Sequence, residues 1–219
     1  MTTFPNAPRL LKGGLVLLNP QTNNPERVII LQYNPQKLSR SLQVQSTGEG
    51  ADRAEALRLT GPPQETINIE AEIDAADQLE KPGENRTVVE VGILPQLAAL
   101  ETILYPDSGR LEANDALASI GTIEISPIEA PLTVFVWSNN RVMPVRITEY
   151  SVTEQAFDPN LNPLRAEVTL GMRVLNINDL GFNHHGGNLF MNYQKRLEEL
   201  SGKQIDGSLN RFGISRRRL

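Results

Sequence analysis

Two adjacent histidines, His184 and His185, are the only imidazole groups in the chain and the first candidates for metal chemistry. Imidazole is a frequent ligand of transition metals. Neighbouring side chains diverge, however, and Asp179 is the only carboxylate close by in sequence, so the pair is poorly placed to bind one ion. Gly186 and Gly187 follow directly, and we expect this segment to be a flexible connector before a last helix.

Two carboxylates, Glu70 and Glu72, form the second candidate site, because residues two apart share one face of a strand. A glycosidase pair requires one carboxylic acid held in a shielded site, whereas these two lie on the face expected to meet water. We therefore expect no catalysis here. A carbohydrate-binding or hydrolytic β-sandwich that uses Glu70 and Glu72 stays open as an alternative.

No other pattern supplies catalytic groups. The chain lacks cysteine and has no Gly-x-Ser-x-Gly motif for an esterase nucleophile. The segment Ser201-Gly202-Lys203 lacks the upstream glycine spacing of a phosphate-binding loop. Trp137, the only tryptophan, lies in an apolar run and is expected to anchor the core. The sequence thus predicts a non-enzymatic protein with no catalytic, cofactor-binding or metal site.

Charge is unevenly spread along the 219 residues, whose net charge is −5. Residues 195–219 hold seven basic and three acidic groups, so this tail carries +4 and the rest of the chain −9. An acidic protein is a poor partner for nucleic acid. The basic tail, which ends in Arg216-Arg217-Arg218, either reaches the acidic body of a neighbouring copy or is a solvated end.

No apolar run approaches the ~18 residues of a membrane span, so we expect no direct insertion into a membrane. Residues 1–11 lack the basic start and apolar stretch of a secretory signal. We therefore expect assembly in the cytoplasm, or export by an unusual route.

The body of the chain reads as β structure. Residues 66–73 and 165–174 alternate between apolar and polar side chains, and a shorter alternation spans 41–45. In 142–157 the alternation changes phase, which predicts a long bent strand with a β-bulge near Thr148-Glu149; Pro144 places its start at an edge or a bulge. Continuous apolar runs predict strands covered on both faces at 15–18, 28–31 and 133–137.

Helices are expected in two places. One begins with a capping box of Thr87 and Glu90, and Pro95 must kink it or begin a new first turn. Its apolar stripe is Ile93, Leu97, Leu100 and Leu104. The other spans about 188–200 and stops at Gly202. Long connections, which become partner-contacting arms in an assembly subunit, are expected at 20–25, 47–56, 75–85 and 107–120.

Two groups of residues follow the pattern of a known protein family. The first is the segment VIILQYNP at 28–35, followed by LTGPP at 59–63 and an alternating strand that ends in Asp74. The second is the apolar strand at 131–137, followed by the bent strand and by FDPNLNPLRA at 157–166, which is similar to the family's Pro-x-Arg-Ala turn. With these segments the chain resembles the tube-type proteins of contractile injection systems, and in particular the baseplate adaptor proteins of phage-tail-like particles, which often carry a LysM module.

This resemblance implies a mainly β, α+β fold, in which two packed antiparallel sheets form a tube-type β-barrel or sandwich with one flanking helix. It implies a tube-type domain at 1–176, followed at 177–219 by a short C-terminal helix and basic tail. It also implies a homo-hexameric structural ring that joins the spike hub to the inner tube and contacts tube-initiator and baseplate wedge proteins. An inner-tube or tube-initiator subunit is the alternative.

The chain departs from the family pattern in two ways. Ser138-Asn139-Asn140 follows the tryptophan where the family usually has glycine, so that hairpin is expected to differ. Residues 177–219 carry no LysM signature, so the last helix and basic tail would have to provide any anchoring.

Strand geometry is compatible with such a ring. If six subunits each give four strands at ~4.8 Å per strand, the barrel is roughly 115 Å around and about 37 Å across. A channel that passes cargo needs a hydrophilic wall. The polar rows that either line it or simply face solvent are Asn68, Glu70 and Glu72, and Glu167, Thr169 and Arg173.

Overall fold

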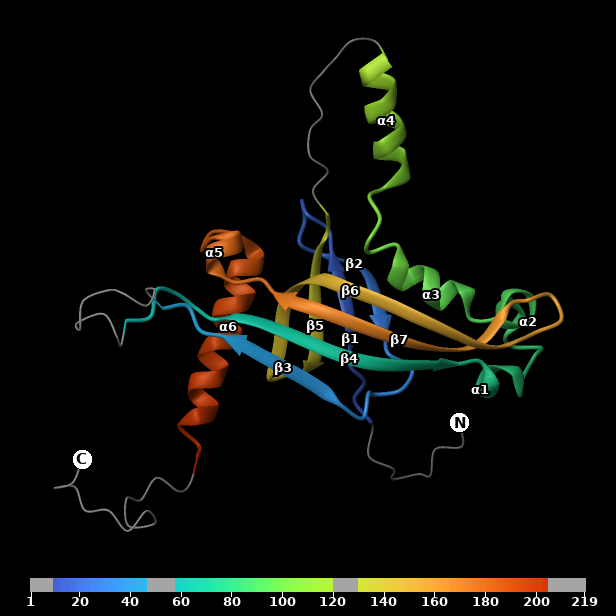
Figure 1. The fold of residues 1–219 in the computed structure, drawn as a ribbon, viewed down its shortest axis with the longest axis horizontal. Helices are drawn as coiled ribbons and strands as arrows, with labels where there is room; N and C mark the ends of the chain where they lie inside the picture. Colours follow the sequence, from blue (N-terminus) through green and yellow to red (C-terminus); the bar gives the residue numbers. More distant parts are fainter. Residues whose placement is uncertain (1–9, 47–57, 120–129, 205–219) are drawn as a thin grey trace.

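The computed structural model describes residues 10–46, 58–119 and 130–204 (Figure 1). Its strands are β1 (Gly14–Leu18), β2 (Pro25–Ile30), β3 (Leu38–Gln43), β4 (Gln64–Asp74), β5 (Leu132–Ser138), β6 (Arg141–Phe157) and β7 (Pro163–Val174). Its helices are α1 (Ala76–Leu79), α2 (Arg86–Val91), α3 (Leu94–Glu101), α4 (Ser108–Ser119), α5 (Ile177–Leu180) and α6 (His185–Ser201). The predicted mainly β, α+β class is confirmed. The connection expected at 47–56 and most of the basic tail lie outside the described residues.

All seven strands belong to one antiparallel sheet, in the order β2-β1-β5-β6-β7-β4-β3. The long strand β6 is shared between two parts of this sheet, because β5 pairs only with residues 141–145 whereas β7 follows β6 from 145 to 157. Figure 1 shows β1, β2 and β5 running across the direction of β3, β4 and β7. The two sheets expected from the sequence are therefore two parts of one bent sheet.

The hydrophobic core lies on the inner face of the bent sheet. The apolar rows predicted on β4 and β7 are buried, and Ile67, Leu170 and Met172 have no exposed surface. Burial of one such side chain stabilises the fold by about 1.5–3 kcal/mol. Side chains from the other part of the sheet and from helices α2, α3 and α6 complete this core, among them Leu15, Val88, Leu97, Leu100, Phe135 and Phe190.

The bulge predicted in β6 is confirmed. The register with β7 shifts between Ile147 and Glu149, and the extra residue brings Tyr150 and Val152 onto the same inner side as Ile147. Pro144 also has a place that tolerates its missing N–H. The carbonyl of Pro144 accepts from Leu175 N at 2.9 Å, and Leu175 lies just after the end of β7. The nitrogen of Pro144 therefore points to the same side, where the regular pairing of β6 with β7 has ended and no N–H donor is needed.

The helix expected beside the sheet is divided into α2 and α3. Gly92, with a φ of +60°, separates them, and Pro95 lies in the first turn of α3, one of the two outcomes expected. The capping box of Thr87 and Glu90 is wrong, since α2 is preceded by Asn85 and has no side-chain cap. Asn85 instead donates its amide to the carbonyls of Gln78 and Lys81.

Two predicted connections contain helices. Residues 75–85 include α1, and 107–120 include α4. The α4 segment is rich in alanine and leucine, which have high helix propensity, although none of its side chains is buried. A helix without a buried face leaves no apolar period in the sequence, so the loop prediction was wrong.

The apolar run at 28–31 is not covered on both faces. It lies in and directly after β2, an outermost strand of the sheet, and Val28 and Ile30 are 58% and 63% exposed. An apolar run predicts a strand, but it does not show whether one or two other strands pair with it. The runs that form β1 and β5 do lie inside the sheet and are largely buried, as predicted.

The segment of the two histidines is an ordered helix start, so the flexible connector was wrong. His184 precedes α6, and its Nδ1 atom accepts from Gly186 N at 3.1 Å. Gly187 is buried, and a Cβ there would overlap the carbonyl oxygen of Gly181. The two glycines therefore let α6 approach the turn after α5.

Gly187→Ala should lower the free energy of unfolding by about 1–3 kcal/mol, because the added methyl group forces backbone apart. The matched control is Gly83→Ala, at a site where a Cβ meets nothing within 4 Å, and it should change stability by less than about 0.5 kcal/mol. Urea unfolding measures both variants. Equal effects would contradict the close approach of α6.

Candidate functional site

The carboxylates Glu70 and Glu72 lie on the outer face of β4, as expected. Glu72 Oε1 accepts from Arg165 Nε at 2.8 Å, and Glu70 lies opposite Thr169 beside a hollow of about 50 Å³. That hollow is of the size of one or two waters. The described residues contain no group of three or more histidine, aspartate or glutamate side chains that could hold a metal. A hydrolytic role for the two carboxylates stays a prediction.

The remaining sequence candidates lie apart from one another. Trp137 is half-buried, packs against the core and stacks on Phe135 with ring centroids 5.9 Å apart. Ser201 ends α6, and Lys203 follows it. Arg216, Arg217 and Arg218 fall outside the described ranges. Among the described residues, neither Trp137 nor the Ser201–Lys203 segment joins the histidines or Glu70 in one site.

A continuous polar surface covers four neighbouring strands, and we call it the polar face. The strand registers align its side chains across the sheet, where Thr169 lies between Glu70 and Ser151, and Glu167 lies opposite Thr153. All of its side chains are exposed or half-exposed. Its members are Ser39 and Ser41 of β3, Asn68 and Glu70 of β4, Glu167 and Thr169 of β7, and Ser151 and Thr153 of β6.

Both borders of the polar face are free strand edges within the described residues. On one side β3 pairs only with β4, and on the other side β6 beyond Val145 pairs only with β7. Each border also carries apolar side chains toward the core side of the sheet. Leu38 and Leu42 belong to β3, and Tyr150 and Val152 to β6; Leu42 is 49% exposed. Unpaired apolar edges of this kind invite pairing with another chain.

The family-like segment at 32–35 joins distant parts of the chain through two side-chain amides. Gln32 Nε2 donates to Asp74 O at 2.6 Å and Gln32 Oε1 accepts from Asp74 N at 3.0 Å, so one side chain imitates a strand partner. Asn34 Oδ1 accepts from Gly13 N at 3.0 Å, and Asn34 Nδ2 donates to Leu11 O at 2.8 Å. The side-chain amides of Gln and Asn can do this because each carries both a donor and an acceptor.

The second family-like segment forms the turn between β6 and β7. Asp158 accepts from the backbone N–H groups of Asn160 and Asn162, both at 2.8 Å, and from the Asn162 amide. Hydrogen bonds from Asn162 lower the pKa of Asp158. At the end of this turn, Pro163 O accepts from Ile93 N at 2.9 Å, which ties the turn to the start of α3.

A buried polar cluster that the sequence analysis missed connects α6 to the sheet. Glu65 of β4 is only 4% exposed; it accepts from Arg40 Nε of β3 at 2.6 Å, and Arg40 Nη2 donates to Tyr193 OH of α6 at 2.6 Å. The hydrogen bond to Glu65 raises the pKa of Arg40, and burial followed by the Glu65 charge raises that of Tyr193. Glu65 lies two residues before Ile67, so continued alternation would have placed it on the buried face.

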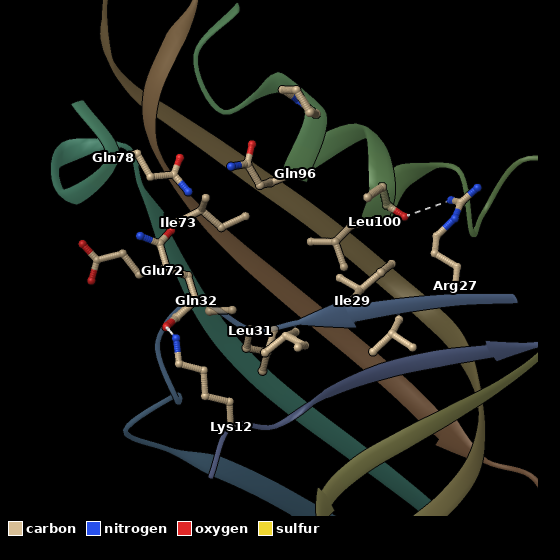
Figure 2. Close-up of a pocket in the computed structure, with 15 residues that line it drawn as sticks. Lys12, Arg27, Ile29, Leu31, Gln32, Glu72, Ile73, Gln78, Gln96 and Leu100 are labelled. Atoms are coloured by element: carbon tan, nitrogen blue, oxygen red, sulfur yellow. Dashed lines mark hydrogen bonds between the residues drawn. The ribbon is translucent and has the colours of Figure 1, made fainter. Parts of the chain in front are cut away.

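A cavity of about 450 Å³ lies between β2, β4 and α3 (Figure 2). Its walls are mostly apolar and include Ile29, Leu31 and Leu100. Gln78 and Gln96 also line it, and their buried Oε1 atoms have no hydrogen-bond partner among the described residues.

Comparisons with known proteins yield weak likenesses only. No family model matches the chain, and no curated protein matches it. Among solved structures, the chain is similar to one from the tail of an empty gene transfer agent particle with C6 symmetry, at 11% identity and a TM-score of 0.28. It is also similar to a chain of the virion of a native gene transfer agent particle, at 13% identity and a TM-score of 0.26. Each match covers 74% of this chain and 90% of the other, and scores this low do not establish a shared fold or function.

No helix in the described ranges is both long and apolar enough to cross a membrane.

Arg40→Ala should destabilise the protein by about 3–5 kcal/mol, because it leaves the buried Glu65 carboxylate without its cation. Replacing both Arg40 and Glu65 with Met should restore most of that loss. The control is Arg165→Ala, which breaks solvent-exposed pairs with Glu72 and Asp74 and should destabilise the protein far less, because water screens these charges. Urea unfolding of the four proteins measures the differences, and equal losses for both arginines would contradict the importance of the buried cluster.

The turn at Asp158 should make stability depend on pH. Its pKa is lower in the folded than in the unfolded state, so the carboxylate stabilises the fold above its unfolded value of about 3.9, and this contribution is lost as the pH falls through the folded pKa. The difference in unfolding free energy between wild type and Asp158→Ala should therefore be largest near neutral pH and shrink in acid. A gap of constant size in urea unfolding from pH 7 to pH 2 would refute this.

Proposed function

We propose that this protein is a non-enzymatic structural subunit that assembles into a closed ring around a polar channel. The observation that carries the proposal is the polar face, which spans four strands and is bordered on both sides by a free edge with apolar side chains. One edge is β3 and the other is the distal half of β6. Because the two edges differ, pairing between copies is head to tail and closes into a ring when the rotation permits.

Pairing of β3 with β6 of the next copy satisfies both edges at once. It extends the backbone ladder from subunit to subunit and buries Leu42 against the region of Tyr150 and Val152 of the neighbour. The side chains of the polar face then line the inside of the ring. With six copies and four strands from each, a circumference of roughly 115 Å at ~4.8 Å per strand gives a channel about 37 Å across before tilt is considered.

We place this ring in the baseplate of a contractile, phage-tail-like particle, between the spike hub and the inner tube, with tube-initiator and baseplate wedge proteins as further partners. The support is the sequence resemblance at 28–35 and 157–166, whose residues form the amide contacts of Gln32 and Asn34 and the Asp158 turn. The tube-type domain is 1–176, and 177–219 provide the anchoring helix and tail. Assembly takes place in the cytoplasm.

The same polar face would suit an inner-tube or tube-initiator subunit. Copy number separates the two functions, because a stacked tube protein greatly exceeds a single baseplate ring. Quantitative mass spectrometry of the purified particle should find two copies of this chain for each subunit of a trimeric hub. A large excess would favour the tube, and absence from the particle would contradict both.

Leu42→Lys should prevent ring formation while the subunit stays folded, because it places a charge on the apolar edge of β3. The matched control is Val89→Lys on α2, since Val89 is 47% and Leu42 49% exposed. Sedimentation measures assembly, and circular dichroism confirms folding. Assembly of Leu42→Lys at wild-type concentrations would overturn pairing through this edge.

A further inference from the structure

Helix α4 buries no side chain against the described part of its own subunit. None of its 12 residues is buried, and Figure 1 shows it extending away from the sheet. A helix of this length is only marginally stable alone in water. Its two leucines lie on different sides. Asp115 follows Leu111 by four residues and Glu112 by three, so it adjoins both of them on the helix surface, whereas Leu117 lies about 120° around the helix axis from Leu111, near Arg110.

The cavity beside β2 offers the Leu111 side of α4 an apolar floor and two cations, and Glu72, the carboxylate that also lines it, accepts from Arg165. Its floor is apolar, formed in part by Ile29, Leu31 and Leu100, and Figure 2 shows Lys12 and Arg27 at separate places along it. Lys12 donates to Gln32 O at 2.9 Å and Arg27 to Thr102 Oγ1 at 2.5 Å. Neither cation forms an ion pair with a carboxylate of the described residues.

We propose that α4 of one copy docks in this cavity of a second copy. Leu111 enters the apolar cavity, while Glu112 and Asp115 approach Lys12 and Arg27 at its rim. The inference rests on the proposed ring, because only an assembly holds copies at the required proximity. The helix reaches another copy because residues 102–107 direct it away from α3, whose Leu100 forms part of its own subunit's cavity (Figure 1).

Disulfide trapping tests this contact directly, because the chain contains no cysteine. Ala99→Cys places a thiol on the α3 wall of the cavity, and Leu111→Cys places one on α4. Mixing the two single variants and oxidising them should give a cross-linked dimer with twice the 24.2 kDa mass on non-reducing gels. The matched control is Leu117→Cys, with 44% exposure against 50% for Leu111, and it should cross-link to Ala99→Cys roughly tenfold less, because disulfides require close Cβ atoms.

Charge reversal provides a second measurement. The combined change Lys12→Glu and Arg27→Glu in the Ala99→Cys variant should slow cross-linking roughly tenfold, and Glu112→Lys with Asp115→Lys in the Leu111→Cys variant should restore it. A non-specific apolar contact would show no such rescue.

The outcomes also separate this inference from the proposed function. Rings that assemble without the cross-link, or that cross-link equally through Leu117→Cys, overturn the α4 contact and leave the ring intact. A cross-link that forms only within a chain carrying both cysteines shows that α4 closes on its own cavity, which also overturns the proposal. A chain that stays monomeric at the highest attainable concentration contradicts both the ring and the contact.

Discussion

The backbone groups along an unpaired strand edge impose the main constraint on this fold. Within the described residues, the part of the sheet that carries the polar face is bordered by two free, partly apolar edges, whose N–H and C=O groups are left for water or for another chain to satisfy. Here β6 creates one of those edges by leaving β5 after residue 145 and continuing with β7 alone. The departure of β6 from β5 thus produces two features, namely the bend that encloses the core and one border of the polar face.

Side-chain amides fix the bent sheet where strand pairing cannot. Gln32 contacts the end of β4, and Asn34 contacts the residues before β1, so two neighbouring side chains define where three segments of the chain meet. Each bond contributes about 0.5–1.5 kcal/mol net. Their greater importance is geometric, because Gln32, which lines the cavity between β2, β4 and α3, joins the chain after β2 to the end of β4.

Local patterns predicted the parts of the structure that depend on a two-residue period. Alternation of apolar and polar residues revealed β4 and β7, and a change in the phase of this alternation revealed the bulge at residue 148. The sequence could not show that β2 is an outermost strand, because the number of strands that pair with it does not depend on its own residues. It could not show α4 either, because a helix without a buried face has no apolar periodicity. The amide contacts of Gln32 span 42 residues and are invisible locally. Glu65 was within reach, because it continues the buried alternation of β4.

The Arg40–Glu65–Tyr193 cluster has a mechanical consequence for an assembled particle. Tyr193 belongs to α6, whereas Arg40 belongs to β3, an edge strand. Tension applied to the chain after α6 passes through Tyr193 to β3 and β4, where several ladder bonds share the load. In the proposed ring, a pull on the chain after α6 therefore loads the ladder bonds of β3 and β4 together instead of one at a time.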